Sequence, residues 1–157
     1  MKYLFVLISL FVATLITHAQ PKPVEMRMLQ DHYFAGDESL LEQGLNTIVL
    51  TSRKEYEKYF GTTSRPDTPH FSKEWMLILV LPTTKYDASL VFERVSVKAG
   101  DFMEVYCNVD TKKKKLTYDH NPLAACVVPK QENISKVDFY NRRKGLHLMS
   151  TVNIRQR

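Results

Sequence analysis

The histidines and cysteines are the residues of this sequence best suited to chemistry. A metal site needs several imidazole, thiolate or carboxylate ligands that converge on one point. Downstream of residue 20, no two histidines or cysteines have the HxxxH or CxxC spacing that brings such ligands together. The sequence therefore predicts no metal site and no cofactor. The four histidines downstream of residue 20 are scattered along the chain, at His32, His70, His120 and His147.

One group of residues contains the side-chain types of a cysteine hydrolase, namely Cys126 with His120 and Asn121. They lie within seven positions, in a predicted turn and a predicted buried strand, so their side chains are not expected to converge. The chain has no Gly-x-Ser-x-Gly nucleophile elbow and no glycine-rich phosphate loop. We predict no catalytic residue, and an enzyme of unrecognised type is the least favoured class of function.

Residues 1–19 have the form of a cleavable signal peptide, with a basic Lys2, an apolar stretch over residues 3–16 and small residues around Ala19. A retained membrane anchor is the alternative, but the apolar stretch is shorter than the roughly 20 residues that a span requires. We therefore expect a secreted or periplasmic protein with no stable membrane insertion after cleavage. Residues 20–157 are predicted to form one domain.

Export would place Cys107 and Cys126 where disulfides persist. Both are predicted to lie in the middle of strands, and a bridge closing the loop between them would add about 3 kcal/mol of stability. The alternative is two buried free thiols, which behave as small apolar side chains. A disulfide between these cysteines is the favoured expectation, and the sequence leaves both states open.

The formal net charge of the chain is +5 at pH 7, and removing Lys2 with the signal peptide would leave +4. That excess is modest for a chain of this length and serves solubility. It does not amount to the concentrated basic surface of a nucleic-acid-binding protein. We expect no nucleic-acid partner.

The residues above must be positioned by a core, and the strongest core signal is the apolar run over residues 75–81, Trp-Met-Leu-Ile-Leu-Val-Leu. An unbroken apolar run of strand length, ended by Pro82, predicts a central strand covered on both faces. Before it, Ser52 and Glu55 match a capping box, and Tyr56, Tyr59 and Phe60 form one apolar face, so a helix is predicted from there to Gly61.

The remaining pattern is dominated by strands. Apolar residues alternate with others over residues 102–109, which predicts a strand with one face in the core. The proline-bearing residues 20–24 are predicted to be a flexible lead, and residues 83–87 and 110–121 to be polar connections. We predict an α+β fold, mainly an antiparallel β-sheet or sandwich with one packed helix. The other predicted strands cover residues 24–28, 46–50, 90–97, 123–128, 137–140 and 146–154.

Four consecutive lysines, Lys112, Lys113, Lys114 and Lys115, must be solvated. The favoured interpretation is a solvated hairpin tip that keeps an edge from aggregating. The functional alternative is a contact with an acidic partner surface, a polysaccharide or anionic lipid. Together with Tyr86 these lysines are the weakly supported candidates for partner binding.

The segments 51–61, Thr-Ser-Arg-Lys-Glu-Tyr-Glu-Lys-Tyr-Phe-Gly, and 71–82, Phe-Ser-Lys-Glu-Trp-Met-Leu-Ile-Leu-Val-Leu-Pro, resemble the secreted bacterial family named after the PrcB C-terminal domain. The resemblance extends more loosely over most of residues 46–129. It implies a small β-rich module, in the namesake case an accessory that binds and stabilises a surface protease, and it brings no catalytic residues. The family often has a glycine-rich turn leading into a tyrosine after the core strand, whereas this chain reaches Tyr86 without a glycine.

The resulting hypothesis is an exported, non-enzymatic interaction module, accessory to another exported protein such as a protease. The alternative is a small-ligand or glycan-binding domain with a cleft edged by Tyr86, Tyr106 and Tyr118. A deep aromatic-lined pocket would favour the ligand binder, and a filled interior with an exposed apolar patch would favour the protein partner.

Overall fold

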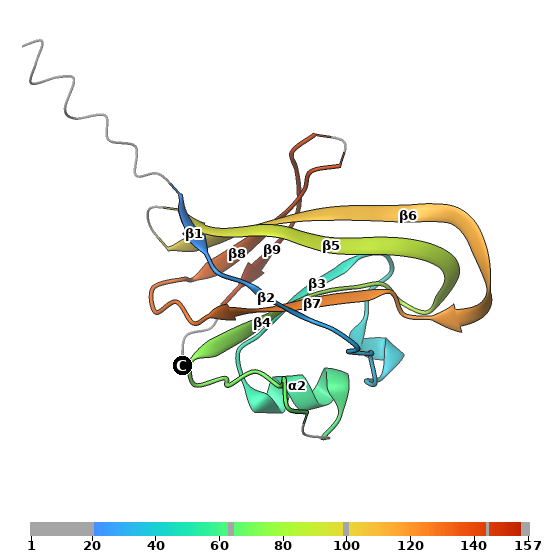
Figure 1. The fold of residues 1–157 in the computed structure, drawn as a ribbon, viewed down its shortest axis with the longest axis horizontal. Coiled ribbons are helices and arrows are strands. Elements are labelled where there is room, and N and C mark those ends of the chain that lie inside the picture. The colour runs from blue at the N-terminus through green and yellow to red at the C-terminus, as the bar shows by residue number, and fades with distance from the viewer. Residues whose placement is uncertain (1–20, 63–64, 99–100, 144, 155–157) are drawn as a thin grey trace, which may run out of the picture.

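The computed structural model describes residues 21–154, apart from residues 63–64, 99–100 and 144. The predicted signal peptide at residues 1–19 lies outside the described residues. Most of the described chain is strand, arranged in two sheets, with one short α-helix; the coarse prediction of a β-rich α+β fold is confirmed. Figure 1 shows one sheet above the other and the helix α2 below both.

The lower sheet contains four antiparallel strands in the order β2-β7-β4-β3. Strand β4 lies between two neighbours, and its Leu77 is opposite Val49 of β3 and Cys126 of β7. The predicted core strand is therefore an interior strand. The bounds are Arg27–Leu29 for β2, Asn46–Leu50 for β3, Glu74–Val80 for β4 and Leu123–Pro129 for β7.

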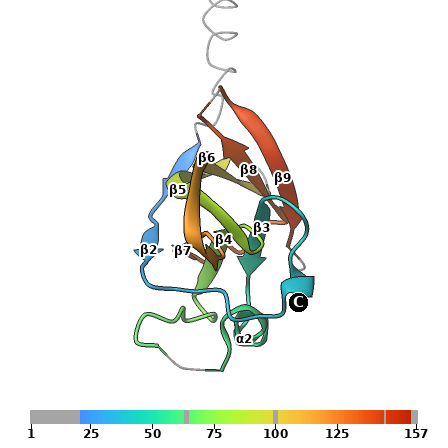
Figure 2. The ribbon, with the colours of Figure 1, turned by 90° about the vertical axis from the view of Figure 1, so that its right-hand side faces the viewer.

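The upper sheet contains five strands in the order β1-β5-β6-β8-β9. It is mixed, because β6 and β8 are parallel while the other pairs are antiparallel. Figure 2 shows β8 and β9 on one side of this sheet and β5 and β6 running toward the viewer. The bounds are Lys22–Val24 for β1, Thr84–Lys98 for β5, Phe102–His120 for β6, Lys136–Asn141 for β8 and His147–Asn153 for β9.

Strand β4 is buried on both faces, as its apolar run predicts. Trp75, Leu77 and Leu79 belong to a core cluster that also contains buried residues of β5, β6 and β8, so one face of β4 packs against the upper sheet. The alternate residues belong to a second cluster on the side of the helix. Because the side chains of a strand alternate between its faces, one seven-residue strand supports both clusters.

The helix α2 (Arg53–Phe60) begins with the predicted capping box. Ser52 Oγ accepts a hydrogen bond from the Glu55 backbone N at 3.3 Å, and Glu55 Oε2 accepts one from the Ser52 backbone N at 3.1 Å. Tyr56 is fully buried and stacks on Phe60, with ring centroids 4.9 Å apart. The aromatic face predicted for this helix therefore packs against the lower sheet. A single 3₁₀ turn, η1 (Glu38–Leu40), precedes it.

The first described residues are not the flexible lead predicted over residues 20–24. Lys22–Val24 forms strand β1 and pairs with Val95, Ser96 and Val97 of β5, and the chain then crosses to the lower sheet as β2. The single strand predicted over residues 24–28 is thus divided between the two sheets. Pro23 is compatible with this position because β1 is an edge strand, where a missing backbone N–H need not break a ladder.

Strands β5 and β6 are much longer than predicted, and the segments 83–87 and 110–121 are not simple connections. Residues 84–92 of β5 and 108–120 of β6 form a two-stranded extension beyond β1 and β8, which we call the ribbon. The register shifts on both sides of Tyr86, and such bulges bend a strand pair. The ribbon curls downward at the right of Figure 1.

The sequence does not predict the strands of the ribbon, and the reason is physical. With only each other as neighbours, its two strands have largely solvent-accessible side chains and show no alternation of apolar and polar residues. Lys112, Lys113, Lys114 and Lys115 therefore lie within strand β6, and the interpretation that they form a hairpin tip is wrong.

Shortening Leu77 tests the double-sided core. Leu77 is fully buried, so Leu77→Ala is expected to lower the free energy of unfolding by about 2–5 kcal/mol through lost burial and a residual cavity. Val91→Ala on the ribbon, where the side chain is 45% exposed, is the control and should change it by less than about 0.5 kcal/mol. Urea denaturation measures both. A cost below about 1 kcal/mol for Leu77→Ala would contradict this packing.

The capping box should also give the stability a specific pH dependence. Burial raises the pKa of Glu55, but the hydrogen bonds from Thr51 and Ser52 together have the larger, opposite effect. The pKa of Glu55 therefore lies below its ordinary value. The folded state then gains stability from ionised Glu55 above about pH 4.3 and loses it as the pH falls through the lowered pKa. We expect Glu55→Gln to cost about 1 kcal/mol at pH 6.5 and progressively less toward pH 3. A cost that stays constant over this range in urea titrations would contradict the assignment.

Candidate functional site

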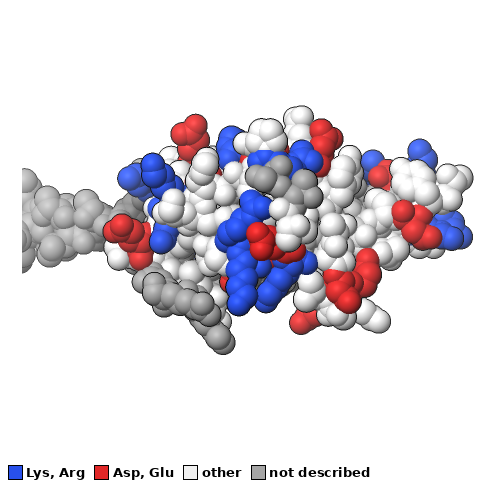
Figure 3. Space-filling view, turned by 90° about the horizontal axis from the view of Figure 1, so that it is seen from below, with Lys and Arg blue, Asp and Glu red and all other residues white. Residues whose placement is uncertain are grey.

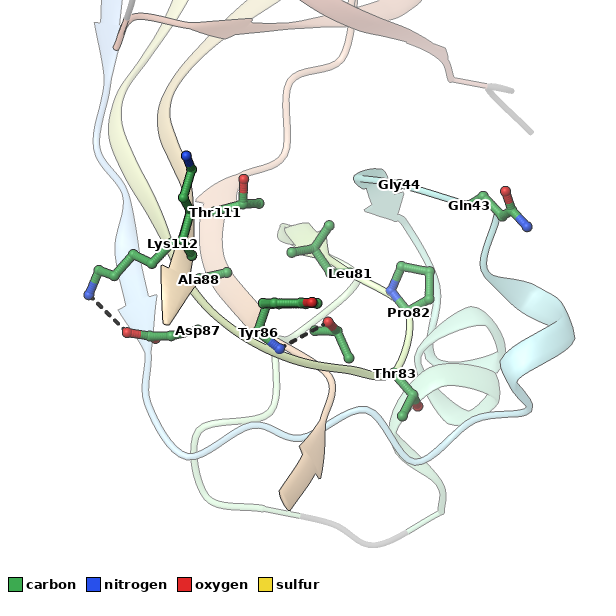
Figure 4. A pocket seen from close by; sticks show the side chains of 12 residues that line it. Gln43, Gly44, Leu81, Pro82, Thr83, Tyr86, Asp87, Ala88, Thr111 and Lys112 are labelled. Atoms are coloured by element: carbon green, nitrogen blue, oxygen red, sulfur yellow. Dashed lines mark hydrogen bonds and ion pairs between the residues drawn. The ribbon is translucent and has the colours of Figure 1, made fainter. Parts of the chain in front are cut away.

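A groove of about 810 Å³ lies under the curl of the ribbon. The β4–β5 connection and the beginning of β5 form one wall, the loop before β3 forms a second, and the bend of β6 completes it. Figure 4 shows Tyr86 together with Leu81 and Pro82 around this space, and Gln43 and Gly44 across from the ribbon. We call it the Tyr86 groove. Its lining residues are Gln43, Gly44, Leu81, Pro82, Thr83, Thr84, Tyr86, Asp87, Ala88, Thr111, Lys112 and Lys113.

Tyr86 is the aromatic residue of the groove, and its side chain is 52% exposed. The Tyr86 backbone N donates a hydrogen bond to Thr84 Oγ1 at 3.1 Å, which holds the bulged start of β5. Leu81 and Pro82, at the end of the core strand, add apolar surface. The groove therefore combines a half-exposed aromatic ring with an apolar wall anchored to the most buried strand of the protein.

A hydrogen-bond network around Glu38 fixes the wall at which η1, the β4–β5 connection and the β6–β7 turn meet. Thr83 Oγ1 and Asn121 Nδ2 both donate to Glu38 Oε1, the second at 2.8 Å, and the Leu81 backbone N donates to the Pro122 carbonyl at 2.9 Å. The hydrogen bonds from Thr83 and Asn121 hold the pKa of Glu38 below its ordinary value. No local pattern in the sequence reveals this network, because its members are far apart in the chain.

The second wall is held by Asn46. Its side-chain Oδ1 accepts a hydrogen bond from the Glu42 backbone N at 2.8 Å, and its Nδ2 donates to the Glu42 and Gly44 carbonyls. Gly44 adopts a φ of 92°, in the left-handed region that favours glycine, and this turn brings the chain into β3. The loop facing Tyr86 is therefore tied to the start of β3, the edge strand of the lower sheet that pairs with the core strand β4.

The lysine run forms the basic part of the site. Lys112 pairs with Asp87 of β5, with 3.1 Å between Nζ and Oδ2, and both residues line the groove. Lys113, Lys114 and Lys115 are exposed and have no ion pair within the part of the chain that the structure describes. An exposed pair such as Lys112–Asp87 contributes little to stability, so the run is available to a partner without cost to the fold.

The charged surface elsewhere is mixed. Figure 3 views the molecule from the side of α2, and basic side chains gather at the centre of that face with acidic ones beside them. At the right-hand end, where the ribbon lies, both signs are again close together. This agrees with the pairs Lys112–Asp87 and Lys85–Asp119 on the ribbon.

Strand β6 offers an open edge beside the groove. Strand β8 pairs with β6 only as far as Cys107, which is opposite Asn141. Beyond this point Asn141 Oδ1 accepts a hydrogen bond from the Val109 backbone N at 3.4 Å, and among the described strands only β5 pairs with residues 110–120 of β6. Backbone donors and acceptors on this edge can therefore pair with an added extended segment.

The structure brings together only some of the predicted site residues. Tyr86, Lys112 and Lys113 line one groove, whereas Lys114 and Lys115 lie farther along the ribbon. The three tyrosines of the predicted ligand cleft are not assembled. Tyr106 is buried, with its ring stacked on Tyr140 at 5.5 Å and its hydroxyl donating to Glu104 Oε2 at 2.8 Å. Tyr118 lines a different hollow.

Tyr106 escaped correct assignment because of the sheet order. It lies in the section of β6 that is flanked by both β5 and β8, opposite Arg94 and Tyr140. The Arg94 guanidinium covers its ring at 4.4 Å from the centroid. The parallel neighbour β8 comes from a distant part of the chain, so the local sequence around Tyr106 does not reveal it. For this reason the sequence suggests that Tyr106 is exposed and able to contact a ligand.

Cys107 and Cys126 are free thiols in the structure, and both are completely buried in the core between the sheets. The expected disulfide is thus not formed there. Burial, with a smaller effect of Glu93, raises the pKa of Cys107 to about 12. Burial also raises the pKa of Cys126.

The other chemistry-bearing residues are separated by the fold. Cys126 faces the core, while the Asn121 amide is held by Glu38 and the Leu81 carbonyl. Over residues 21–154, with the gaps given above, no group of three or more histidine, cysteine or acidic side chains could hold a metal ion. Over the same residues no helix has the length and apolar character needed to span a membrane.

The chain matches no family model, and no match is found among curated proteins or among solved structures.

The buried thiols generate a labelling prediction. With a pKa near 12, about one Cys107 in ten thousand is ionised at pH 8, and no probe reaches either sulfur in the folded state. We expect Ellman's reagent to label the native protein only at the rate of unfolding and to label both cysteines at once in guanidinium chloride. Absence of labelling in guanidinium without reductant, restored by dithiothreitol, would show instead that the two cysteines form a disulfide.

Proposed function

We propose that this protein is an exported, non-enzymatic interaction module that binds another exported protein, as an accessory to a partner such as a protease. The Tyr86 groove is the observation that supports this proposal most directly. It joins an exposed aromatic ring, an apolar wall and the unpaired Lys113 beside an open strand edge. This combination suits an extended polypeptide. Its apolar side chains can pack on the ring and the wall, its carboxylates can pair with lysine, and its backbone can pair with the strand edge.

The geometry of the groove favours an extended, acidic segment of the partner. Residues 110–120 of β6 can add one strand along their open edge, and the side chains of such a strand would alternate between the groove and solvent. Lys113, Lys114 and Lys115 would then attract carboxylates on the partner, and Tyr86 would cover an apolar side chain in the groove. Charge would govern the rate of association and the ring would contribute the buried contact.

The interior of the protein supports a surface role. The two core clusters fill the space between the sheets and the space under the helix with buried side chains. We also infer that the two sheets form a β-sandwich, because one cluster unites residues of β4 and β7 with residues of β5, β6 and β8. A packed sandwich leaves binding to its surface and its extensions.

The proposed partner and location rest on the sequence. The features of residues 1–19 support export. The segments that carry the resemblance to the PrcB C-terminal-domain family fold as the helix α2 and the core strand β4. The core strand β4 leads directly into Leu81 and Pro82 of the groove, and a role in stabilising a surface protease would be in keeping with that resemblance.

Affinity capture tests the proposal. The tagged protein is used as bait on the exported fraction of its own organism, beside a variant in which Lys112, Lys113, Lys114 and Lys115 are serines and a second variant with Tyr86→Ala. We expect one stoichiometric protein partner, with recovery reduced at least about tenfold by each variant and weakened by added salt in the wild type.

A matched control removes the same charge elsewhere. Serine at Lys54, Lys58, Lys73 and Lys130, four exposed lysines outside the groove, should leave capture unchanged. Equal loss with both quadruple variants would show a general charge effect and contradict a docking site at the groove. Hydrolytic turnover by the purified protein, abolished by a single change of a groove residue, would refute the non-enzymatic role.

A further inference from the structure

A second hollow, of about 650 Å³, lies beyond the Tyr86 groove along β5. Three segments that are distant in sequence line it: residues 32–34 after β2, residues 88–90 of β5, and residues 118–123 around the β6–β7 turn. Ala88 lines both cavities, so the ribbon separates two neighbouring surfaces. Nothing in the proposed protein-binding role uses this hollow.

Two exposed tyrosines border the hollow. Tyr33 is 73% exposed and Tyr118 is 60% exposed, more than any other aromatic residue in the described chain. Tyr118 also contacts the edge of the His120 ring, with centroids 5.7 Å apart. Exposed aromatic rings do not stabilise the core, and around a concave surface they provide flat apolar faces on which a ring-shaped ligand can stack.

The hollow also gathers unsatisfied polar atoms. In the described part of the chain, three buried side-chain nitrogen or oxygen atoms have no hydrogen-bond partner, and two of them are His32 Nε2 and His120 Nδ1. Both histidines line the hollow. Buried polar atoms are nearly always paired in folded proteins, so two orphan nitrogens at one place call for a functional explanation.

The contacts of His32 determine which kind of hydrogen-bonding group can pair with its free Nε2. His32 Nδ1 lies 3.1 Å from the Gln30 carbonyl oxygen and 3.7 Å from Asp67 Oδ2, and both oxygens accept rather than donate, so the proton is on Nδ1. Nε2 of the neutral ring is then an acceptor without a donor. The ring is held edge-on by Phe60, at 5.6 Å between centroids. A ligand that satisfies Nε2 must offer a donor such as a hydroxyl group.

A metal ion is a poorer match for this donor set. Two imidazoles are present, but no third histidine, cysteine or carboxylate joins them in a cluster within the described residues. Of the other polar side chains at the hollow, the Asn121 amide already bonds to Glu38 and the Leu81 carbonyl, and Ser89 adds a neutral hydroxyl group, which is not among the usual ligands of zinc. The chemistry that fits is a ring with hydroxyl groups along its edge.

We propose that this hollow is a carbohydrate-binding site, in which Tyr118 and Tyr33 stack on a sugar ring while His32 and His120 accept hydrogen bonds from its hydroxyl groups. Because both orphan nitrogens lie under the surface, the hydroxyls reach His32 Nε2 through a bridging water, and reach His120 Nδ1 through a bridging water or after rotation of its imidazole. The sugar is a free saccharide or one residue of a glycan chain. The proposal is independent of the protein-binding role of the Tyr86 groove.

Calorimetric titration of the purified protein tests the site. The probes are glucose, N-acetylglucosamine and the β-1,4-linked hexamers of each. We expect saturable binding of at least one probe, weakened at least about tenfold by Tyr118→Ala. Tyr118→Phe retains the ring and should bind nearly as well as the wild type. His120→Phe retains a ring but removes the acceptor, and should also weaken binding.

The matched control is Tyr86→Ala, which removes an exposed ring from the other groove and should leave sugar binding unchanged. Similar affinity for a single ring and its hexamer would identify a free saccharide as the ligand, and a much tighter hexamer would identify a glycan chain. Absence of saturable binding by all four probes at about 10 mM would overturn the proposal. So would binding that Tyr86→Ala abolishes and Tyr118→Ala leaves intact. Circular dichroism of each variant excludes unfolding as the cause of a loss.

Discussion

The burial of β4 on both faces is the constraint on which the rest of the structure depends. The side chains of this strand point alternately into two core clusters, so each of its faces needs a covering layer. The upper sheet covers Trp75, Leu77 and Leu79, and α2 with its aromatic face covers Met76, Ile78 and Val80. The capping box at Ser52 therefore does more than begin a helix, because it fixes where Tyr56 enters the lower cluster.

The ribbon is the part of the fold that this core does not require. The buried core residues of β5 and β6 lie between Phe92 and Cys107, where the two strands have additional neighbours in β1 and β8. Beyond that section they continue as a pair, bent by bulges beside Tyr86, and their curl creates a groove and a hollow. The network around Glu38 ties the returning chain to the end of β4, so the shape of these cavities is fixed by the core.

The elements that the sequence predicts well are those with a strong local signal. Strand β4 has an unbroken apolar run, and α2 has its cap and its aromatic face, all within a few residues. The ribbon has no such signal, since neither of its faces is consistently buried. The parallel pairing of β6 with β8 and the division of β1 from β2 depend on contacts between distant segments. Tyr86 and the lysines are recognisable by residue type, whereas the hollow is not, because only the fold brings His32 and His120 to the same cavity.

The separation of the ribbon from the core has a consequence for binding. Tyr86, Tyr118 and the lysine run contribute little apolar burial, so their replacement should not compromise folding, whereas Leu77 cannot change without weakening both sheets. A surface of this kind can specialise for different ligands on a constant scaffold. Because Ala88 lines both cavities, an occupant that displaced the ribbon at one would change the width of the other. Such coupling would be reciprocal. If a ligand in one cavity changed the affinity of the other cavity through the position of the ribbon, the second ligand would change the affinity of the first by the same factor.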